Sequence, residues 1–292
     1  MNFEKWLKMN TSDLSGKTVA VTGTTGGLGT ELCKFLCELN ADLVLLDRNV
    51  QKSANFQKEL QILYPDCKIT RIRVDLEDMN SVKIAVRTLK NLPLDMFIHN
   101  AGAYSIPRHK SSAGFDNVFQ INFVSPYYMI RELMPHLKER CGHVVAVGSI
   151  AHNYSKTDPD DTDFSTRTAS SKVYGNAKRY LMFSLYELFK GETDVTLSVV
   201  HPGITFTNIT AHYPKVIFAV IKHPMKVIFM KPKKAALCIL KGVFRSTAYH
   251  QWIGPRIFNV WGLPKLRKLK TCSRPESNSI GQTAQKIYED LK

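Results

Sequence analysis

Short apolar runs alternate with longer amphipathic stretches along the chain. The runs have the length and β-branched content of strands, and the stretches between them carry apolar residues at helical spacing. Residues 42–47 are apolar except at their ends, as in a strand buried on both faces of a parallel sheet. This alternation predicts a single-domain α/β fold with a doubly wound, mostly parallel sheet of about seven strands. We expect strands at 17–22, 42–47, 68–74, 95–99, 143–148, 195–200 and 249–253, and helices at about 28–39, 50–63, 79–91, 113–138 and 174–190.

The first strand runs directly into a glycine-rich turn. Residues 22–29 read Thr-Gly-Thr-Thr-Gly-Gly-Leu-Gly, and an apolar helix follows. Strand, glycine turn and helix in this order favour a dinucleotide site over an ordinary glycine-rich turn. The glycines let the backbone approach a pyrophosphate, and the helix N-terminus attracts its charge. The predicted contacts are Gly23, Thr25, Gly27, Leu28 and Gly29.

The second strand ends in an acidic residue followed by a basic one. Asp47 lies 24 residues after Gly23, where a carboxylate can bind the hydroxyls of the adenosine ribose. Arg48 can instead pair with the 2′-phosphate of NADP. Because Asp47 would repel that phosphate and the glycine turn contains no basic residue, the sequence favours NAD over NADP.

Two more strand ends carry residues suited to the same cleft, since open α/β sheets bind ligands beyond the carboxyl ends of their strands. Asp75 and Leu76 end the third strand and can face the adenine. Asn100-Ala101-Gly102 ends the fourth, and its small residues allow the backbone to wall the cofactor cleft.

A tyrosine and a lysine lie one helical turn apart, on the same face of a predicted helix. They are Tyr174 and Lys178. A free phenol titrates near 10, so acid–base work at neutral pH requires a lowered pKa. A fixed ammonium nearby can supply much of that shift, and a cationic cofactor the rest. The spacing therefore suits an acid–base pair, although it also occurs by chance on surface helices.

Asn122 lies between Ile121 and Phe123 in an otherwise apolar helical stretch, where asparagine is disfavoured. Two interpretations stay open. Asn122 is either a satisfied polar group that bonds a backbone carbonyl, or the site of a kink and a water relay beside the active site.

Composition narrows the class of protein. The 292 residues are 44% hydrophobic and 22% charged, as in an ordinary globular domain. Six scattered cysteines lack the spacing of a metal site, so we expect no bound metal and a reducing compartment. We see no signal peptide and no run long enough to span a bilayer, and we expect a cytoplasmic protein.

The net charge of +15 is concentrated in the carboxyl third. Residues 195–275 contain no acidic side chain, and 215–274 contain fourteen lysines and arginines. Apolar clusters interleaved with lysines near 216–230 fit either a lid over an apolar substrate pocket or a peripheral element on an anionic membrane surface. Nucleic acid is disfavoured as a partner, because no binding motif accompanies the charge.

Together these motifs resemble the short-chain dehydrogenase/reductase family, over about Lys17 to Gly254. The long interval between Ser149 and Tyr174, and Ile253-Gly254-Pro255, are similar to its retinol-dehydrogenase-like branch. The motifs that carry the resemblance are Thr-Gly-x-x-x-Gly-x-Gly at 22–29, Asn100-Ala101-Gly102, Asn122, Ser149, Tyr174-x-x-x-Lys178, and Pro202-Gly203 with Thr207.

The resemblance implies a Rossmann-type fold and a role for each residue. Tyr174 is then the catalytic acid/base, and Lys178 lowers its pKa and binds the nicotinamide ribose. Ser149 hydrogen-bonds the substrate oxygen, and Asn122 supports a water-linked proton relay. The cofactor contacts extend to Tyr174, Lys178, Pro202, Gly203, Thr205 and Thr207.

Three positions depart from the family pattern. His99 replaces a common asparagine, Gly148 a common serine, and Thr205 a Val or Ile beside the carboxamide. None of these changes removes a catalytic atom.

The sequence thus predicts an NAD(P)-dependent oxidoreductase that interconverts an alcohol and its carbonyl, with a lipophilic small-molecule substrate. A non-catalytic dinucleotide sensor or scaffold of the same fold is the alternative. By resemblance we expect a homo-oligomer, a dimer or tetramer paired through the helices that carry Asn122 and Tyr174. The expected organisation is a lead-in helix at 1–15, one domain at 16–272 with a lid at about 204–231, and a polar tail at 273–292. We expect the tail to be helical from residue 281 and to pack on the body or on a partner.

Overall fold

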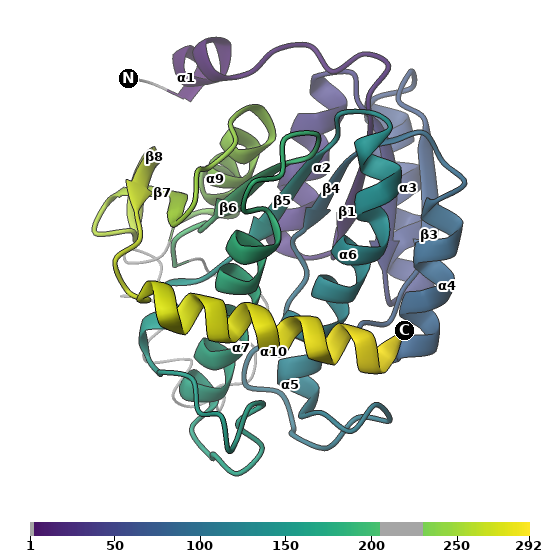
Figure 1. Ribbon diagram of the computed structural model, residues 1–292. Coiled ribbons are helices and arrows are strands. Elements are labelled where there is room, and N and C mark those ends of the chain that lie inside the picture. The colour runs from purple at the N-terminus through teal and green to yellow at the C-terminus, as the bar shows by residue number, and fades with distance from the viewer. Residues whose placement is uncertain (1–2, 205–229) are drawn as a thin grey trace, which may run out of the picture.

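The computed structural model describes residues 3–204 and 230–292. Within these ranges eight strands form one sheet, in the order β3-β2-β1-β4-β5-β6-β7-β8 (Figure 1). Neighbouring strands are parallel except β7 and β8, so the predicted doubly wound, mostly parallel fold is confirmed. The strands are β1 (Thr18–Thr22), β2 (Asp42–Asp47), β3 (Ile69–Arg73), β4 (Leu94–His99), β5 (His143–Val147), β6 (Thr196–Val200), β7 (Gln251–Ile257) and β8 (Trp261–Lys268).

Helices cover both faces of the sheet. Alternate residues of a central strand enter different cores, which is why these strands are apolar throughout: Val19 and Val21 pack on one side and Ala20 on the other. The first side holds α2 (Gly27–Glu38), α3 (Val50–Leu63) and α9 (Pro232–Phe244), and the second holds α4 (Met79–Leu89), α6 (Ser125–Lys138) and α7 (Ser170–Leu188).

The sheet has one strand more than the predicted seven. The expected last strand at 249–253 is instead β7, which continues to Ile257 and turns back into β8. The alternating pattern of β8 is interrupted by one proline and by basic residues, which are tolerated on an edge strand, so the sequence does not reveal it. Pro264 pairs with Pro255 in this hairpin.

The helix expected over 113–138 begins later and is irregular. It starts as α5 (Asn117–Phe119), passes through a π-helical turn η1 (Gln120–Val124), and continues as α6. Asn122 lies within the π turn, so the irregularity predicted at this residue is present. Its side-chain amide donates to the carbonyls of Val118 and Ala103, each at 2.8 Å, which satisfies the buried group.

Both ends of the described chain are helical. The lead-in helix α1 (Phe3–Asn10) buries Trp6. The segment expected as a polar tail is α10 (Arg274–Leu291), capped by Ser273, and its apolar side joins the core. Figure 1 shows α10 lying across α7 and α6. It therefore covers the helices through which pairing was expected. No helix in the described ranges has the length and apolar content to cross a membrane.

Candidate active site

A cavity of about 430 Å³ opens at the carboxyl ends of β1, β2, β3 and β4. All the cofactor contacts predicted from these strand ends line it: Gly23, Thr25, Gly27, Leu28, Gly29, Asp47, Arg48, Asp75, Leu76, Asn100, Ala101 and Gly102. Sequence reasoning missed further lining residues, namely Thr22, Gly26, Leu46, Asn49, Lys52, Val74, Ala103 and Ile121. Lys52 could have been found, because it lies in the first turn of the helix that follows Asp47.

The glycine turn fits close approach of a ligand to the backbone. Gly23 has a φ of 69°, and a Cβ there would lie 3.0 Å from the Cα of Ala101. A Cβ on Gly29 would lie 2.2 Å from the carbonyl oxygen of Gly23. The N-cap of α2 is Gly26, which makes no side-chain capping bond. The first backbone N–H groups of α2 are therefore free of a side-chain cap at the cavity, as an anion site requires.

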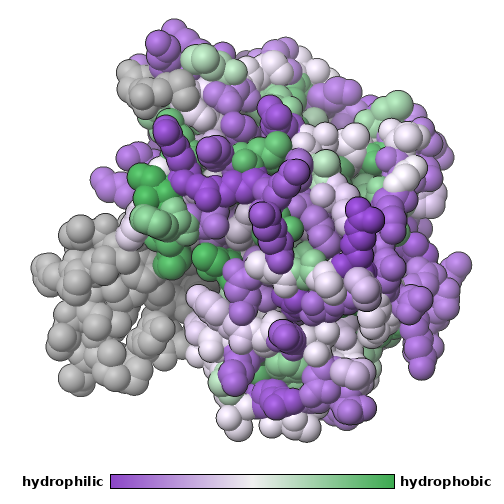
Figure 2. Space-filling model, turned by 60° about the vertical axis from the view of Figure 1, so that its left-hand side comes forward, coloured by the Kyte–Doolittle hydropathy of each residue, from purple (hydrophilic) through white to green (hydrophobic). Residues whose placement is uncertain are grey.

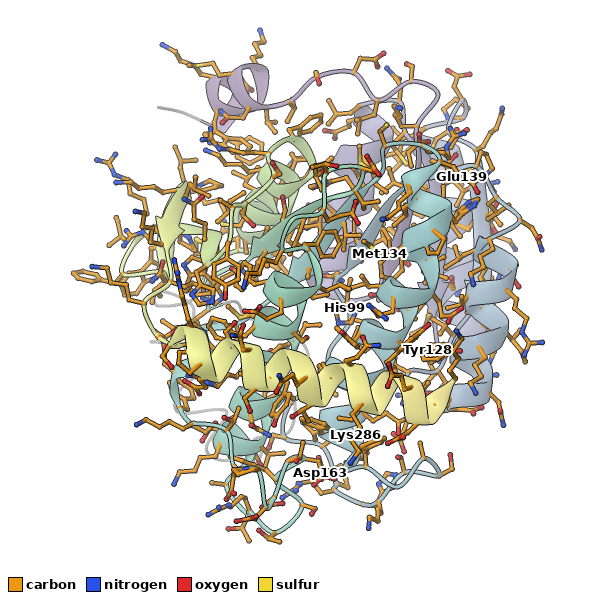
Figure 3. All side chains as sticks on the ribbon, viewed as in Figure 1. His99, Tyr128, Met134, Glu139, Asp163 and Lys286 are labelled. Carbon is orange, nitrogen blue, oxygen red and sulfur yellow. The ribbon has the colours of Figure 1, made fainter. Side chains whose placement is uncertain are left out.

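Asn100 ties this turn to β4. Its amide nitrogen donates to the carbonyls of Thr22 (3.0 Å) and Gly23 (3.1 Å). The Thr22 hydroxyl accepts the backbone N–H groups of Asn100 and Ala101 and donates to Nδ1 of His99 at 3.2 Å. His99 points into the interior (Figure 3), where burial lowers its pKa well below the usual value and keeps the ring neutral.

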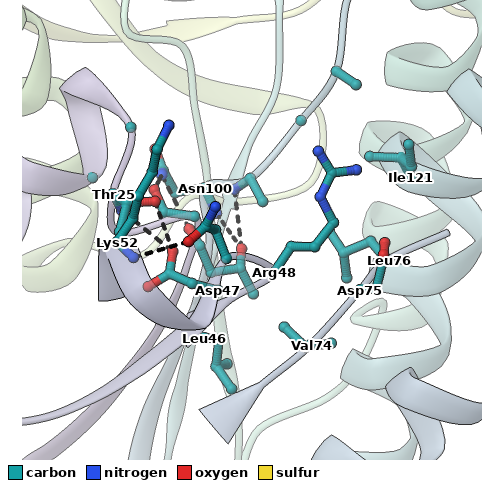
Figure 4. A pocket seen from close by; sticks show the side chains of 18 of the residues that line it. Thr25, Leu46, Asp47, Arg48, Lys52, Val74, Asp75, Leu76, Asn100 and Ile121 are labelled. Atoms are coloured by element: carbon teal, nitrogen blue, oxygen red, sulfur yellow. Dashed lines mark hydrogen bonds between the residues drawn. The ribbon is translucent and has the colours of Figure 1, made fainter. Parts of the chain in front are cut away.

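Hydrogen-bond donors of the protein surround the Asp47 carboxylate. Its carboxylate accepts the hydroxyls of Thr24 (2.5 Å) and Ser53 (2.9 Å), and the backbone N–H of Thr25 at 3.3 Å. Arg48 instead reaches over the cavity towards Ile121 (Figure 4).

Two basic side chains, Arg48 and Lys52, line one side of the cavity. Neither side chain forms an ion pair within the described part of the chain. Because protein donors already occupy the Asp47 carboxylate, the side chains that this corner of the cavity presents to a ligand are Arg48 and Lys52.

The predicted catalytic residues meet beyond the end of β5. Ser149 lies within hydrogen-bonding reach of the Tyr174 phenol. The approach of Tyr174 to Ser149 depends on Gly175, because a Cβ at position 175 would lie 2.3 Å from the carbonyl oxygen of Ala151. Helix α7 can therefore pack closely on the turn that follows Ser149. Tyr104, which no motif singles out, packs edge-on against Tyr174 with ring centroids 5.3 Å apart.

Burial sets the protonation of the Tyr174–Lys178 pair. Lys178 is buried, donates to the carbonyl of Val147 at 2.9 Å, and lies 5.7 Å from the centre of the Tyr174 ring. Desolvation lowers the pKa of Lys178 to about 7 and raises the pKa of Tyr174 to about 12, despite the Ser149 hydrogen bond that lowers it. Lys178 alone therefore does not lower the pKa of Tyr174, because burial disfavours the charged forms of both side chains.

Asn122 and Lys178 approach each other across Gly102. A Cβ on Gly102 would lie 2.7 Å from Oδ1 of Asn122 and 3.6 Å from Nζ of Lys178. The two polar groups therefore flank the same stretch of backbone, which also lines the cavity. Gly148, a second departure from the family pattern, leaves room for Met182: a Cβ there would lie 2.6 Å from its Sδ.

A buried network holds the turn after Ser149. Within the turn η2 (Ile150–Asn153), His152 donates from Nδ1 to the carbonyl of Ser149 at 2.6 Å and accepts the Thr271 hydroxyl at 2.7 Å. Arg179 donates to the carbonyls of His152 and Thr271 and pairs with Glu276 at 2.7 Å. Helix α10 is thereby connected to the catalytic turn.

Pro202 and Gly203 follow β6, and they do not line the cavity at the ends of β1 to β4. Thr205, Thr207 and nearly all of the predicted lid lie outside the described residues. Within the described ranges no group of three or more His, Cys, Asp and Glu side chains is arranged to hold a metal ion.

The family model for short chain dehydrogenase matches residues 17–215. Mouse retinol dehydrogenase 12 is 30% identical over 202 residues, covering 68% of this chain and 64% of that protein. The short-chain dehydrogenase TIC 32 A of Brassica napus is 29% identical over 216 residues, which cover 68% of this chain and 67% of that protein. Human polyprenol dehydrogenase is 28% identical over 207 residues, covering 67% and 63%. The chain therefore spans roughly two-thirds of the length of these relatives.

Fold, cavity and sequence similarity agree on the class of protein, a Rossmann-fold oxidoreductase that binds NAD(P). The chain belongs to the short-chain dehydrogenase/reductase family, and its relatives support the retinol-dehydrogenase-like branch. Two solved structures share the fold. One is a Mycobacterium paratuberculosis protein (TM-score 0.71, 20% identity, 97% of this chain and 96% of that one). The other is L-sorbose reductase from Gluconobacter frateurii (TM-score 0.60, 17% identity, 81% and 95%).

Proposed function

We propose that this protein interconverts an alcohol and its carbonyl compound, using a nicotinamide dinucleotide. The observation that carries this proposal is the meeting of the Ser149 and Tyr174 hydroxyls, with Lys178 buried one helical turn away, beside the cavity that the glycine turn lines. When bound, the nicotinamide supplies or accepts the hydride.

The chain's own residues orient the substrate and move a proton. The Ser149 hydroxyl donates a hydrogen bond to the substrate oxygen, and the Tyr174 hydroxyl exchanges a proton with that oxygen. With its pKa at about 7, Lys178 changes protonation readily at neutral pH, and Asn122 lies close enough to extend a relay through water.

The substrate class we propose is lipophilic. The names of two relatives, polyprenol dehydrogenase and retinol dehydrogenase 12, support this class. The Tyr104 ring, packed edge-on against Tyr174, adds an apolar surface beside the reacting hydroxyls.

For the cofactor we propose NADP, which reverses the preference drawn from the sequence. Thr24, Thr25 and Ser53 donate to the Asp47 carboxylate, so it has little capacity left for ribose hydroxyls. Arg48 and Lys52 at the same corner suit a 2′-phosphate. Side-by-side titrations with NADPH and NADH test this: we expect tighter binding of NADPH, and an Arg48→Gln change that weakens NADPH alone by about tenfold or more. Equal losses for both cofactors would contradict the assignment.

Turnover is tested with a panel of lipophilic alcohols and carbonyl compounds, followed by the absorbance of the reduced cofactor. Tyr174→Phe should lower kcat by about a hundredfold or more, while the exposed control Tyr154→Phe leaves it unchanged. Cofactor binding without turnover of any compound would favour the dinucleotide sensor instead.

A further inference from the structure

The tip of the β7–β8 hairpin exposes large apolar side chains. Phe258 is 79% exposed, Ile257 49% and Trp261 36%. The other exposed large hydrophobic residues of the described ranges lie far from these in the sequence. Figure 2 turns this side of the molecule towards the viewer, and hydrophobic residues gather there beside strongly hydrophilic ones.

The hairpin that carries this tip is basic. Arg256, Lys265 and Lys268 are exposed, and none of them pairs with a carboxylate in the described part of the chain. Since residues 195–275 contain no acidic residue, the sequence around the hairpin offers no local counter-charge. The hairpin therefore carries aromatic and aliphatic side chains at its tip, with Arg256 beside them and further cations along its strands.

The hairpin lies against the turn that follows β6. A Cβ on Gly203 would lie 2.7 Å from the carbonyl oxygen of Val260 and 2.9 Å from Cγ of Pro255. The backbone N–H of His201 donates to the carbonyl of Ile253 at 2.7 Å. The tip is thus fixed to the carboxyl edge of the sheet, the edge at which the catalytic residues meet.

We propose that the tip formed by Ile257, Phe258 and Trp261 docks into the interface of an anionic lipid membrane. Aromatic side chains partition to the headgroup region, and nearby lysines and arginines are attracted to anionic lipid. A protein partner fits less well, because a stable protein interface takes about 20–30 residues a side and this tip is one narrow turn. The docking is independent of the proposed reaction.

Tryptophan fluorescence reports on the tip directly. The sequence contains three tryptophans, and Trp6 and Trp252 are buried. A blue shift on adding vesicles therefore belongs to Trp261. We expect the shift, and co-sedimentation, with vesicles of phosphatidylcholine and phosphatidylserine. With phosphatidylcholine alone both are weaker, and high salt reduces binding to the anionic vesicles.

Substitutions at the tip quantify the contact. Phe258→Ser should weaken binding to the anionic vesicles by about 10- to 100-fold, and Arg256→Gln by about fivefold. The matched control is Ile62→Ser in α3, where the side chain is 81% exposed on another part of the surface. NADPH titration of each variant checks that the fold is retained.

Three results would overturn the proposal. The first is equal vesicle affinity for the Phe258→Ser and Ile62→Ser variants. The second is co-sedimentation with an unchanged Trp261 emission, which would locate the membrane contact elsewhere. The third is an absence of vesicle binding together with self-association that Phe258→Ser abolishes, which would make the tip a contact between copies of the chain. None of these readouts requires turnover.

Discussion

Replacing Glu276 by glutamine should destabilise the protein more than replacing any exposed partner of an ion pair. Glu276 is the carboxylate partner of Arg179, with 2.7 Å to Nη2 and 2.8 Å to Nε. The Arg179 side chain is only 3% exposed, and its remaining acceptors are two backbone carbonyls. The variant therefore keeps a buried guanidinium but removes its only anionic partner in the network.

The expected loss follows from the degree of burial. Removing one partner of a fully buried pair costs about 3–5 kcal/mol. Because the Glu276 side chain is 23% exposed and glutamine still accepts a hydrogen bond, we expect about 2–3 kcal/mol. For a chain of this length that lowers Tm by roughly 4–6 °C.

Thermal and urea unfolding of the two proteins measure this loss. The control is Glu59→Gln, which removes the half-exposed partner of Lys34 and should cost no more than about 0.5 kcal/mol. If Glu276→Gln and Glu59→Gln are equally stable, the buried network does not hold α10 to the body, and the reasoning fails.

Three further predictions concern the glycine turn, the buried histidines and α10. Gly29→Ala should abolish NADPH binding in a titration, because its Cβ would lie 2.2 Å from the Gly23 carbonyl oxygen and displace the turn; binding within about twofold of wild type would contradict this. Burial lowers the pKa of His152 to about 4 and that of His201 to about 3, so stability should fall as the pH drops from about 6.5 to about 4. On unfolding these two histidines together take up about two protons, or about 2.7 kcal/mol per pH unit, and buried His99 and His143, whose pKa values burial also lowers, steepen the fall; denaturant titrations at about pH 7.5 and about pH 5 measure it. Since α10 covers α6 and α7, we expect sedimentation as a monomer, with association only when residues 274–292 are deleted; a wild-type dimer through those helices would refute this.

The glycine turn could be predicted from the sequence, because the spacing of its glycines is what allows the backbone to approach a pyrophosphate. Residues such as Gly23 and Gly29 admit no side chain, so their positions locate the cavity without knowledge of the rest of the fold. The orientation of Asp47 could not be predicted, because it depends on hydroxyls brought in by Thr24 and Ser53 from two other elements.

Elements at the edges of the fold were harder to predict. Strand β8 contains Pro264 and three basic residues among its eight, so its pattern indicates charge rather than a strand, and only pairing with β7 defines it. The polar composition of 273–292 conceals the apolar stripe of α10, although Ile280, Ala284 and Ile287 have helical spacing. The protonation of Tyr174 depends on burial, which spacing alone does not report.

The contact between His152 and Thr271 joins residues 119 positions apart. During synthesis the Ser149 turn therefore leaves the ribosome well before the segment that braces it, and at a typical rate of about 5–20 residues per second this delay lasts roughly 6–24 s. A nascent chain that has already paired β1 with β4, and β4 with β5, still lacks this brace. Competence for catalysis should thus arrive late in translation, after most of the sheet has assembled.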